Sequence, residues 1–231
     1  MKKVSVIVGG TRGIGKQIYK TLKKRGDNIV LISRRRKNNI SADITFDGHL
    51  KIIQKKIKKK INNLIFCQRL RELNPNKFHD YNLMISSSYE LIKILEKKFS
   101  KNSSVVFLSS ISSITVAHDQ DYNYHAARGA IEALVKFLAV NLGKKKIRIN
   151  CVQTSKIIKL ENEKFFQSLG KKEKKLIEKI TPLSRMGTAE DVANLVDFLT
   201  SSKSEFLTGC IIPVDGGLRL VSQETIAKNV L

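Results

Sequence analysis

The sequence contains no tryptophan, three prolines and only three cysteines among its 231 residues. The cysteines (Cys67, Cys151 and Cys210) lie far apart and form no CxxC pair, which indicates reduced thiols and argues against a disulfide framework or a zinc site. The four histidines and the scarce carboxylates show no metal-ligand spacing either, so we expect no bound metal.

Long apolar runs are also missing from the chain. None approaches the roughly 20 residues that a membrane helix needs. The first residues are superficially similar to a signal peptide, because two lysines precede an apolar run, but that run already ends at Gly9. We therefore expect a cytoplasmic protein with no membrane partner.

Acidic residues are few: 20 Asp and Glu stand against 43 Lys and Arg, a formal charge of +23. One interpretation is a polyanionic partner, such as nucleic acid, an anionic membrane surface or an acidic carrier protein. The other is a lysine-rich bias spread over solvated helix faces. Lysines cluster at 55–60, 144–146 and 171–175 without the interleaved aromatic residues of a single-strand binder, which favours the second interpretation and argues against nucleic acid.

The organising stretch of the chain is its first turn. The β-branched run Val4–Val8 is followed by Gly9, Gly13 and Gly15, and then by apolar residues at four-residue steps, which predicts strand, tight turn and helix. Glycines permit the turn and let a phosphate approach bare amides at the positive end of the helix. The spacing differs from G-x-G-x-x-G and from a Gly-Lys-Ser/Thr phosphate loop, and a turn without a ligand would also explain it.

Strand-like and helix-like segments alternate through the rest of the chain. Apolar runs predict strands at 28–32, near 40–44, and at 61–67, 104–108 and 147–152, with a seventh before Asp215. Helical patterns cover 50–61, with Leu50, Ile53, Ile57 and Ile61 on one face, and also 80–99, 124–142, 156–180 and a segment from Ala189.

Three motifs resemble the short-chain dehydrogenase/reductase family. They are the glycine turn, with Val8 where the family has threonine; Ser109-Ser110 at a strand end, followed by Tyr124 and Arg128; and the carboxyl-terminal pattern Pro182 to Gly187 and Thr208 to Gly217. The resemblance covers residues 3 to about 218. With the strand–helix alternation it predicts one α/β domain over 1–231, a Rossmann-type doubly wound parallel sheet of about seven strands with helices on both faces.

The chain departs from the family pattern at three places. Phe66-Cys67-Gln68-Arg69 replaces Asn-Asn-Ala-Gly, Arg128 replaces the active-site lysine, and Thr154-Ser155 replaces Pro-Gly.

The end of the second strand reads Ser33-Arg34-Arg35-Arg36, with no acidic residue. A carboxylate there would bind ribose hydroxyls, whereas arginine favours a 2′-phosphate, so we expect NADP(H) over NAD(H), although a basic surface turn would look the same. The resemblance implies that Asp43 accepts from the adenine amino group. It assigns cofactor binding to Gly9, Thr11, Arg12, Gly13, Ile14, Gly15, Ser33, Arg34, Arg35, Asp43, Ile44, Tyr124, Arg128 and Ile157.

The resemblance makes Tyr124 the acid/base and Ser110 the group that polarises the carbonyl, with Ser109 and Ser112 as alternatives. A tyrosine can do this work if a fixed cation lowers its pKa from near 10, and Arg128 lies one helical turn away. Guanidinium does not titrate, so a proton relay through Arg128 would be impaired or rerouted. Asn82 falls where the family places a relay asparagine; an exposed helical asparagine is the alternative.

Three functions are compatible with these residues. The first is an NADP(H)-dependent oxidoreductase acting on a small carbonyl or alcohol, either free or linked to a carrier or a nucleotide. The second is a catalytically weak relative that binds cofactor as a scaffold or sensor, and the third a polyanion-binding protein on the same fold. The resemblance further implies a substrate lid at 156–180 and a homodimer or homotetramer through helices 80–99 and 123–142.

Overall fold

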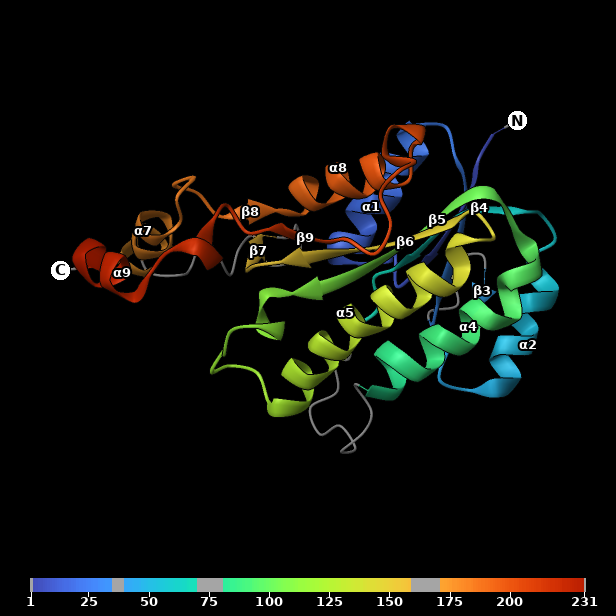
Figure 1. Ribbon diagram of the computed structural model, residues 1–231, viewed down its shortest axis with the longest axis horizontal. Coiled ribbons are helices and arrows are strands. Elements are labelled where there is room, and N and C mark those ends of the chain that lie inside the picture. Colours follow the sequence, from blue (N-terminus) through green and yellow to red (C-terminus); the bar gives the residue numbers. More distant parts are fainter. Residues whose placement is uncertain (1, 35–39, 70–80, 159–170, 231) are drawn as a thin grey trace.

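A computed structural model describes residues 2–34, 40–69, 81–158 and 171–230. Its centre is a seven-stranded, fully parallel sheet in the order β3-β2-β1-β4-β5-β6-β9 (Figure 1). The strands are β1 (Val4–Val8), β2 (Asn28–Ser33), β3 (Ile40–Ser41), β4 (Ile61–Phe66), β5 (Phe99–Ser110), β6 (Ile147–Thr154) and β9 (Ile211–Val214). The strand order reverses between β1 and β4, which is where a doubly wound sheet opens a crevice at its carboxyl ends.

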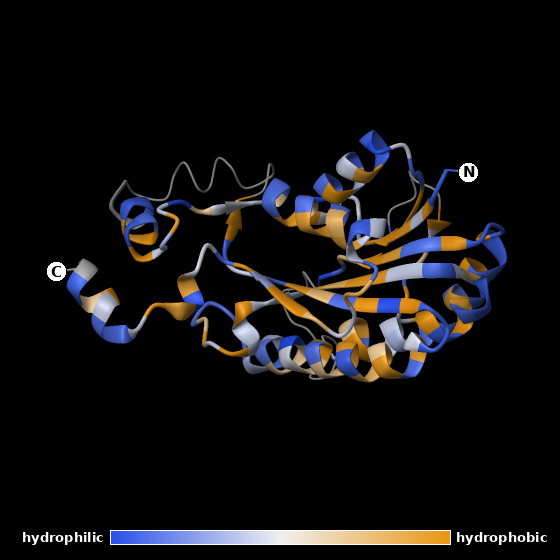
Figure 2. Ribbon diagram, turned by 45° about the horizontal axis from the view of Figure 1, so that its top comes forward, coloured by the Kyte–Doolittle hydropathy of each residue, from blue (hydrophilic) through white to orange (hydrophobic). Residues whose placement is uncertain are grey.

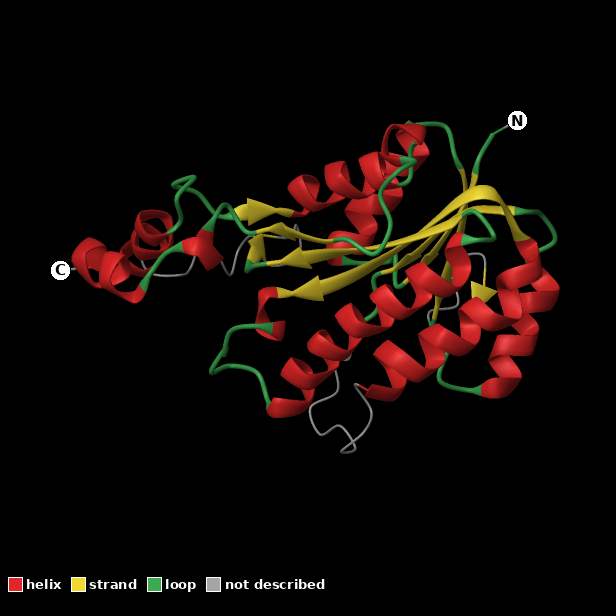
Figure 3. Ribbon diagram, viewed as in Figure 1, coloured by secondary structure: helices red, strands yellow, loops and turns green. Residues whose placement is uncertain are grey.

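Helices cover both faces of this sheet, as Figures 1 and 3 show. One face carries α1 (Gly13–Lys24) and α8 (Ala189–Leu199); the other carries α2 (Asp47–Lys56), α4 (Ser87–Leu95) and α5 (Tyr122–Gly143). The predicted fold class is confirmed.

Two apolar cores lie on either side of the sheet. Neighbouring residues of β1 belong to different cores: Val6 packs toward α2, α4 and α5, whereas Ile7 packs toward α1 and α8, and both are fully buried. Strands buried on both faces read as continuous apolar runs, which is the pattern of parallel sheets and explains why these strands were recognisable. Figure 2 shows the apolar strands between helices that alternate apolar and polar residues.

A smaller unit extends beyond the carboxyl end of the sheet. It contains the two-stranded pair β7 (Ile157–Ile158) and β8 (Gly187–Thr188), and the helices α7 (Lys171–Ile180) and α9 (Gln223–Val230), which pack against each other (Figure 1). The predicted lid therefore contains β7 and α7 where it is described, and its residues 159–170 lie outside the described part. Within the described residues, no helix is long and apolar enough to cross a membrane.

Several predicted helices have different bounds in the structure. Within the segment 156–180, Ile157–Ile158 is the strand β7, and the described helix α7 covers Lys171–Ile180. The segment 50–61 is helical only up to Lys56; Ile57 is still buried, but Ile61 is the first residue of β4. The four-residue spacing continued by coincidence across the loop of lysines at 58–60. The segment 80–99 contains the π-helix η1 (Asn82–Ser86), then α4 and the 3₁₀ turn η2 (Glu96–Lys98), and Phe99 already belongs to β5.

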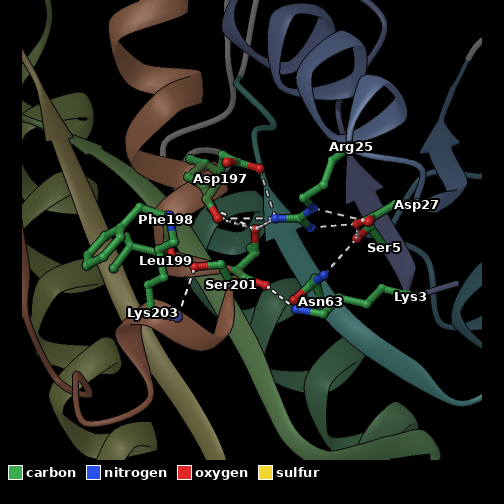
Figure 4. A network of polar contacts seen from close by, with 12 residues as sticks. Lys3, Ser5, Arg25, Asp27, Asn63, Asp197, Phe198, Leu199, Ser201 and Lys203 are labelled. Atoms are coloured by element: carbon green, nitrogen blue, oxygen red, sulfur yellow. Dashed lines mark hydrogen bonds and ion pairs between the residues drawn. The ribbon is translucent and has the colours of Figure 1, made fainter. Parts of the chain in front are cut away.

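The amino end of the sheet is closed by a polar network (Figure 4). Arg25 binds both oxygens of Asp27 at 3.1 and 2.6 Å and the carboxylate of Asp197 at 2.9 Å, which joins α1 and β2 to α8. Ser5 connects Asp27 to Asn63 of β4. The positive charge of Arg25 is thus neutralised by two carboxylates at this end.

Candidate active site

Two adjoining pockets open at the carboxyl end of the sheet, over the reversal between β1 and β4. The first lies over β1 and β2, and the second extends from the start of α1 to β6 and β7. The two pockets share four lining residues and form one continuous cleft. The shared residues are Arg12, Cys67, Gln68 and Arg69.

The glycine turn has no room for side chains. A Cβ on Gly15 would lie 2.5 Å from the carbonyl oxygen of Gly9, and one on Gly9 would lie 2.8 Å from the backbone nitrogen of Gln68. Gly9 and Gly13 also adopt positive φ angles of 81° and 53°, which other residues rarely adopt. The glycines therefore hold the turn close against the end of β4.

Helix α1 begins directly after this turn. Arg12 precedes the helix and makes no side-chain cap, and the first turn contains no acidic residue. The first turn of α1, which contains Gly13, Ile14 and Gly15, therefore turns the positive helix end to the cleft that these residues line. This arrangement fits the pyrophosphate of a dinucleotide, so the residues present match the cofactor that the sequence predicts.

The first pocket has the residues expected around an adenosine. Ser33 ends β2 and Arg34 follows it, and Asp43 and Ile44 follow β3; all four line this pocket together with Thr11 and Arg12. The carboxylate of Asp43 accepts hydrogen bonds from the amide and hydroxyl of Thr45 at 3.0 and 2.7 Å and lies 4.0 Å from Arg34. Arg35, also predicted to bind the cofactor, lies outside the described residues.

The second pocket brings Ser110, Tyr124 and Arg128 together. Ser110 is the last residue of β5, and Tyr124 lies in the first turn of α5, where the Asp121 carboxylate caps its amide at 3.1 Å. Arg128 lies one turn later on the same helical face, with its guanidinium carbon 4.5 Å from the centre of the Tyr124 ring. The predicted acid/base, hydroxyl and cation therefore meet in one place.

The surroundings of Tyr124 change its pKa in two opposing ways. Partial burial raises the pKa because it penalises the phenolate. The Arg128 cation, the neighbouring Ser110 hydroxyl and the Arg69 cation outweigh this effect and lower the pKa of Tyr124 below its ordinary value near 10. The site is thus built to ease ionisation of this phenol.

Arg128 is held rigidly. Its side chain is buried, and one terminal nitrogen donates to the carbonyl of Leu108 at 3.2 Å. Its Nε has no hydrogen-bond partner among the described residues. A buried, unpaired donor at the cleft is suited to a polar group of a bound ligand.

The three candidate serines have different partners. The Ser109 hydroxyl donates to the carbonyl of Arg128 and to Glu132, both at 3.1 Å, and so turns toward α5. Ser110 and Ser112 contact each other through their hydroxyls at 3.2 Å, and both line the cleft. Ser110 is the serine whose hydroxyl influences Tyr124.

Asn82 is not brought into this group. It is exposed at the start of the π-helix η1 and is not among the residues that line the cleft. Its backbone carbonyl accepts a hydrogen bond from the hydroxyl of Ser87 at 2.7 Å. Ile157, by contrast, lines the cleft together with Thr154 and Ser155, which replace the Pro-Gly of the family.

Gln68, Arg69 and Gln120 also line the cleft but were not predicted as site residues. Gln68 donates to Ser88 of α4 at 2.9 Å, and Arg69 donates to the Gln120 amide oxygen at 2.9 Å. The signal that could have identified Gln68 and Arg69 was the departure from Asn-Asn-Ala-Gly. Gln120 carries no such signal, because only the fold brings it to Arg69.

A doubly wound sheet with a glycine turn at the start of a helix and a tyrosine–cation pair defines a dinucleotide-binding oxidoreductase. Residues 8–219 match the family model described as enoyl-(acyl carrier protein) reductase. The chain belongs to the short-chain dehydrogenase/reductase family. It is accordingly an oxidoreductase of the carbonyl–alcohol type, in a family that binds NAD(H) or NADP(H).

Similar sequences have related descriptions. A tropinone reductase homologue of Arabidopsis thaliana is 28% identical over 93% of this chain and 91% of its own. A 3-oxoacyl-[acyl-carrier-protein] reductase of Chlamydia muridarum is 25% identical over 94% and 98%.

Solved structures agree on the fold. A short-chain dehydrogenase family protein from Francisella tularensis has a TM-score of 0.79 at 26% identity, covering 96% of this chain and 100% of that one. The L-sorbose reductase of Gluconobacter frateurii, solved with NADPH and L-sorbose, has a TM-score of 0.81 at 19% identity, covering 96% and 98%.

Proposed function

We propose that this protein is an NADP(H)-dependent reductase or dehydrogenase in which Tyr124 is the acid/base and Ser110 polarises the carbonyl. The observation that carries the proposal is the geometry of Tyr124, Ser110 and Arg128 in the cleft that begins at the amino end of α1. NADP(H), when bound there, supplies or accepts the hydride.

The residues of the chain handle the proton. In the reductive direction, the carbonyl carbon gains the hydride and its oxygen becomes an alkoxide, to which the Tyr124 hydroxyl gives its proton. Arg128 then stabilises the phenolate, and solvent returns the proton. Ser110 donates to the carbonyl oxygen and orients it. Arg128 does not titrate, so its role here is electrostatic rather than that of a proton relay.

Preference for NADP(H) is proposed on the basis of charge. Arg12 and Arg34 line the first pocket where a 2′-phosphate would lie, and β2 ends without a carboxylate. Gly9, Thr11, Gly13, Ile14 and Gly15 would hold the phosphates, while Asp43 and Ile44 would face the adenine.

A self-associating protein is also proposed. Helix α5 leaves two large apolar side chains in solvent, Phe137 at 55% and Val140 at 78% exposed. Such side chains favour burial against a second copy of the chain, which supports pairing through α4 and α5.

The test is a fluorescence titration with NADPH and with NADH, followed by NADPH oxidation with a panel of carbonyl compounds. We expect NADPH to bind about 10- to 100-fold more tightly than NADH, because charge-assisted bonds to one phosphate are worth that much. Tyr124→Phe should lower turnover by about 10²- to 10⁴-fold, far more than it lowers NADPH affinity.

Each alternative outcome is distinct. Tight NADPH binding without turnover of any compound would favour the cofactor-binding scaffold. Absence of binding to either nucleotide would contradict both functions, and leave the polyanion-binding alternative to be tested.

A further inference from the structure

Arg69 occupies an unusual position for a cationic side chain. It lies three residues beyond the end of β4, where the family pattern has a glycine, and its guanidinium carbon is 5.3 Å from the centre of the Tyr124 ring. It therefore approaches the acid/base from the end of β4, whereas Arg128 approaches it from α5 itself.

Gln120 orients this guanidinium. Its amide oxygen accepts from one terminal nitrogen of Arg69 at 2.9 Å, and Gln120 lies in the loop before α5 that lines only the second pocket. The contact draws Arg69 toward the side of the cleft where Tyr124 lies and away from the adenosine side. The remaining N–H groups of Arg69 make no hydrogen bond within the described part of the chain.

The charge around this position is unbalanced. Arg12, Arg69, Arg128 and Lys156 line the second pocket with one carboxylate, Asp119, and none of the four cations forms an ion pair within the described ranges. The proposed cofactor accounts for Arg12, and Tyr124 accounts for Arg128. Arg69 is left beside Tyr124 with a planar fork that matches a carboxylate or a phosphate.

We propose that Arg69, held by Gln120, binds an anionic group of the substrate, so that the substrate class is a carbonyl compound with a nearby carboxylate or phosphate. This rests on the proposed function, because it takes Tyr124 as the place of the carbonyl. Because Arg69 lies close to the Tyr124 ring, the anionic group must lie only a few bonds from the carbonyl carbon. The strongly basic cleft then serves as a specificity device.

The experiment uses two matched pairs of carbonyl compounds with NADPH: acetoacetate against ethyl acetoacetate, and dihydroxyacetone phosphate against dihydroxyacetone. The wild type should prefer the charged member of at least one pair, and which pair responds distinguishes carboxylate from phosphate. Arg69→Gln should lower kcat/KM for that charged member by about 10- to 100-fold, mainly through KM, and change the neutral member far less.

The ratio of kcat/KM between the charged and the neutral member of a pair separates substrate binding from catalysis. Removing Arg69 also changes the electrostatics of Tyr124, but that change affects both members of a pair equally. Lys136→Gln on the outer side of α5 removes the same charge outside the cleft and should leave the ratio unchanged. Arg69→Lys should restore part of the preference, because it keeps the charge and loses the fork.

A binding measurement does not depend on turnover. The charged member of each pair is titrated calorimetrically into the NADP⁺-loaded wild type and the Arg69→Gln variant, and tighter binding to the wild type supports the proposal. Equal binding, or an equal loss for charged and neutral members in kinetics, would overturn the role of Arg69 while the oxidoreductase function stands. Failure to bind NADP⁺ at all would instead contradict the proposed function.

Discussion

The two ends of the parallel sheet contain arginines in opposite situations. At the amino end, Arg25 is bound by Asp27 and Asp197, and the network joins α1, β2 and α8 (Figure 4). At the carboxyl end, Arg69 and Arg128 contact an aromatic ring and backbone or amide oxygens, and no carboxylate of the described residues pairs with them. The comparison separates charge that stabilises the fold from charge that is available to a ligand.

The glycine turn should give the largest effect. Gly15→Ala places a Cβ 2.5 Å from the backbone oxygen of Gly9, where nothing flexible can yield. We expect NADPH affinity to fall by at least about 100-fold, because the turn must shift away from the phosphates. Gly48→Ala in α2, where a Cβ meets nothing within 4 Å, is the matched control and should bind normally in the same fluorescence titration.

Breaking the amino-end network should lower stability without affecting the cleft. Arg25→Met leaves the buried carboxylate of Asp27, whose side chain is 4% exposed, without its ion-pair partner. The free energy of unfolding should fall by about 2–3 kcal/mol in urea denaturation. NADPH affinity should stay within about twofold. A loss of affinity as large as that of Gly15→Ala would show that the two ends are not separable. Lys20→Met on the exposed side of α1 is the control.

Arg128 should control the pH dependence of turnover. Reduction requires the protonated Tyr124, so its rate falls as pH rises through the pKa of this phenol, which lies below its usual value. Removing the cation in Arg128→Met disfavours the phenolate, raises this pKa and moves the fall to higher pH, with about tenfold lower turnover. Arg128→Lys should keep the wild-type profile. An unchanged profile in Arg128→Met would contradict the electrostatic role.

Removal of the Asp191 carboxylate, which pairs with Arg185 at the start of α8, should have the smallest effect. The hydrogen bond from Arg185, together with those from Thr188, lowers the pKa of Asp191 to about 2, and Thr188 and Asp191 form a capping box. Because the folded pKa is depressed, this stabilisation is present above about pH 4 and is lost as pH falls toward 2.

Asp191→Asn should therefore cost about 1 kcal/mol of unfolding free energy at pH 7 and almost nothing near pH 2. Urea denaturation across this range measures it. An equal loss at both pH values would mean that the carboxylate charge is not what stabilises the helix start.

Much of the fold could be predicted from the sequence because its signals are local. Strands buried on both faces are continuous apolar runs, and the glycines at 9, 13 and 15 predict the turn that the structure contains. The predicted helix end at residue 61 was wrong. Ile57 and Ile61 are both buried, but Ile57 follows the last turn of α2 and Ile61 begins β4. Periodicity alone cannot distinguish burial in a helix from burial in the strand that follows it.

The site was less accessible to sequence reasoning. Tyr124 and Arg128 are one turn apart on a helix, so their proximity follows from spacing alone. The contact between Arg69 and Gln120 joins residues 51 positions apart, and no local pattern predicts it. Asn82 is the opposite case, because its position in the sequence matches a family pattern but its side chain is exposed. That exposure depends on how η1 packs, which the residues next to Asn82 in the sequence do not indicate.

Hydrogen–deuterium exchange with and without NADPH tests the central claim most directly, because it reads both ends of the sheet in one experiment. We predict slower exchange over residues 9–15 and 32–34 and no change over 25–28 and 197–204. Unchanged exchange at the glycine turn, or equal slowing at the Arg25 network, would contradict the assignment of the carboxyl end as the cofactor site.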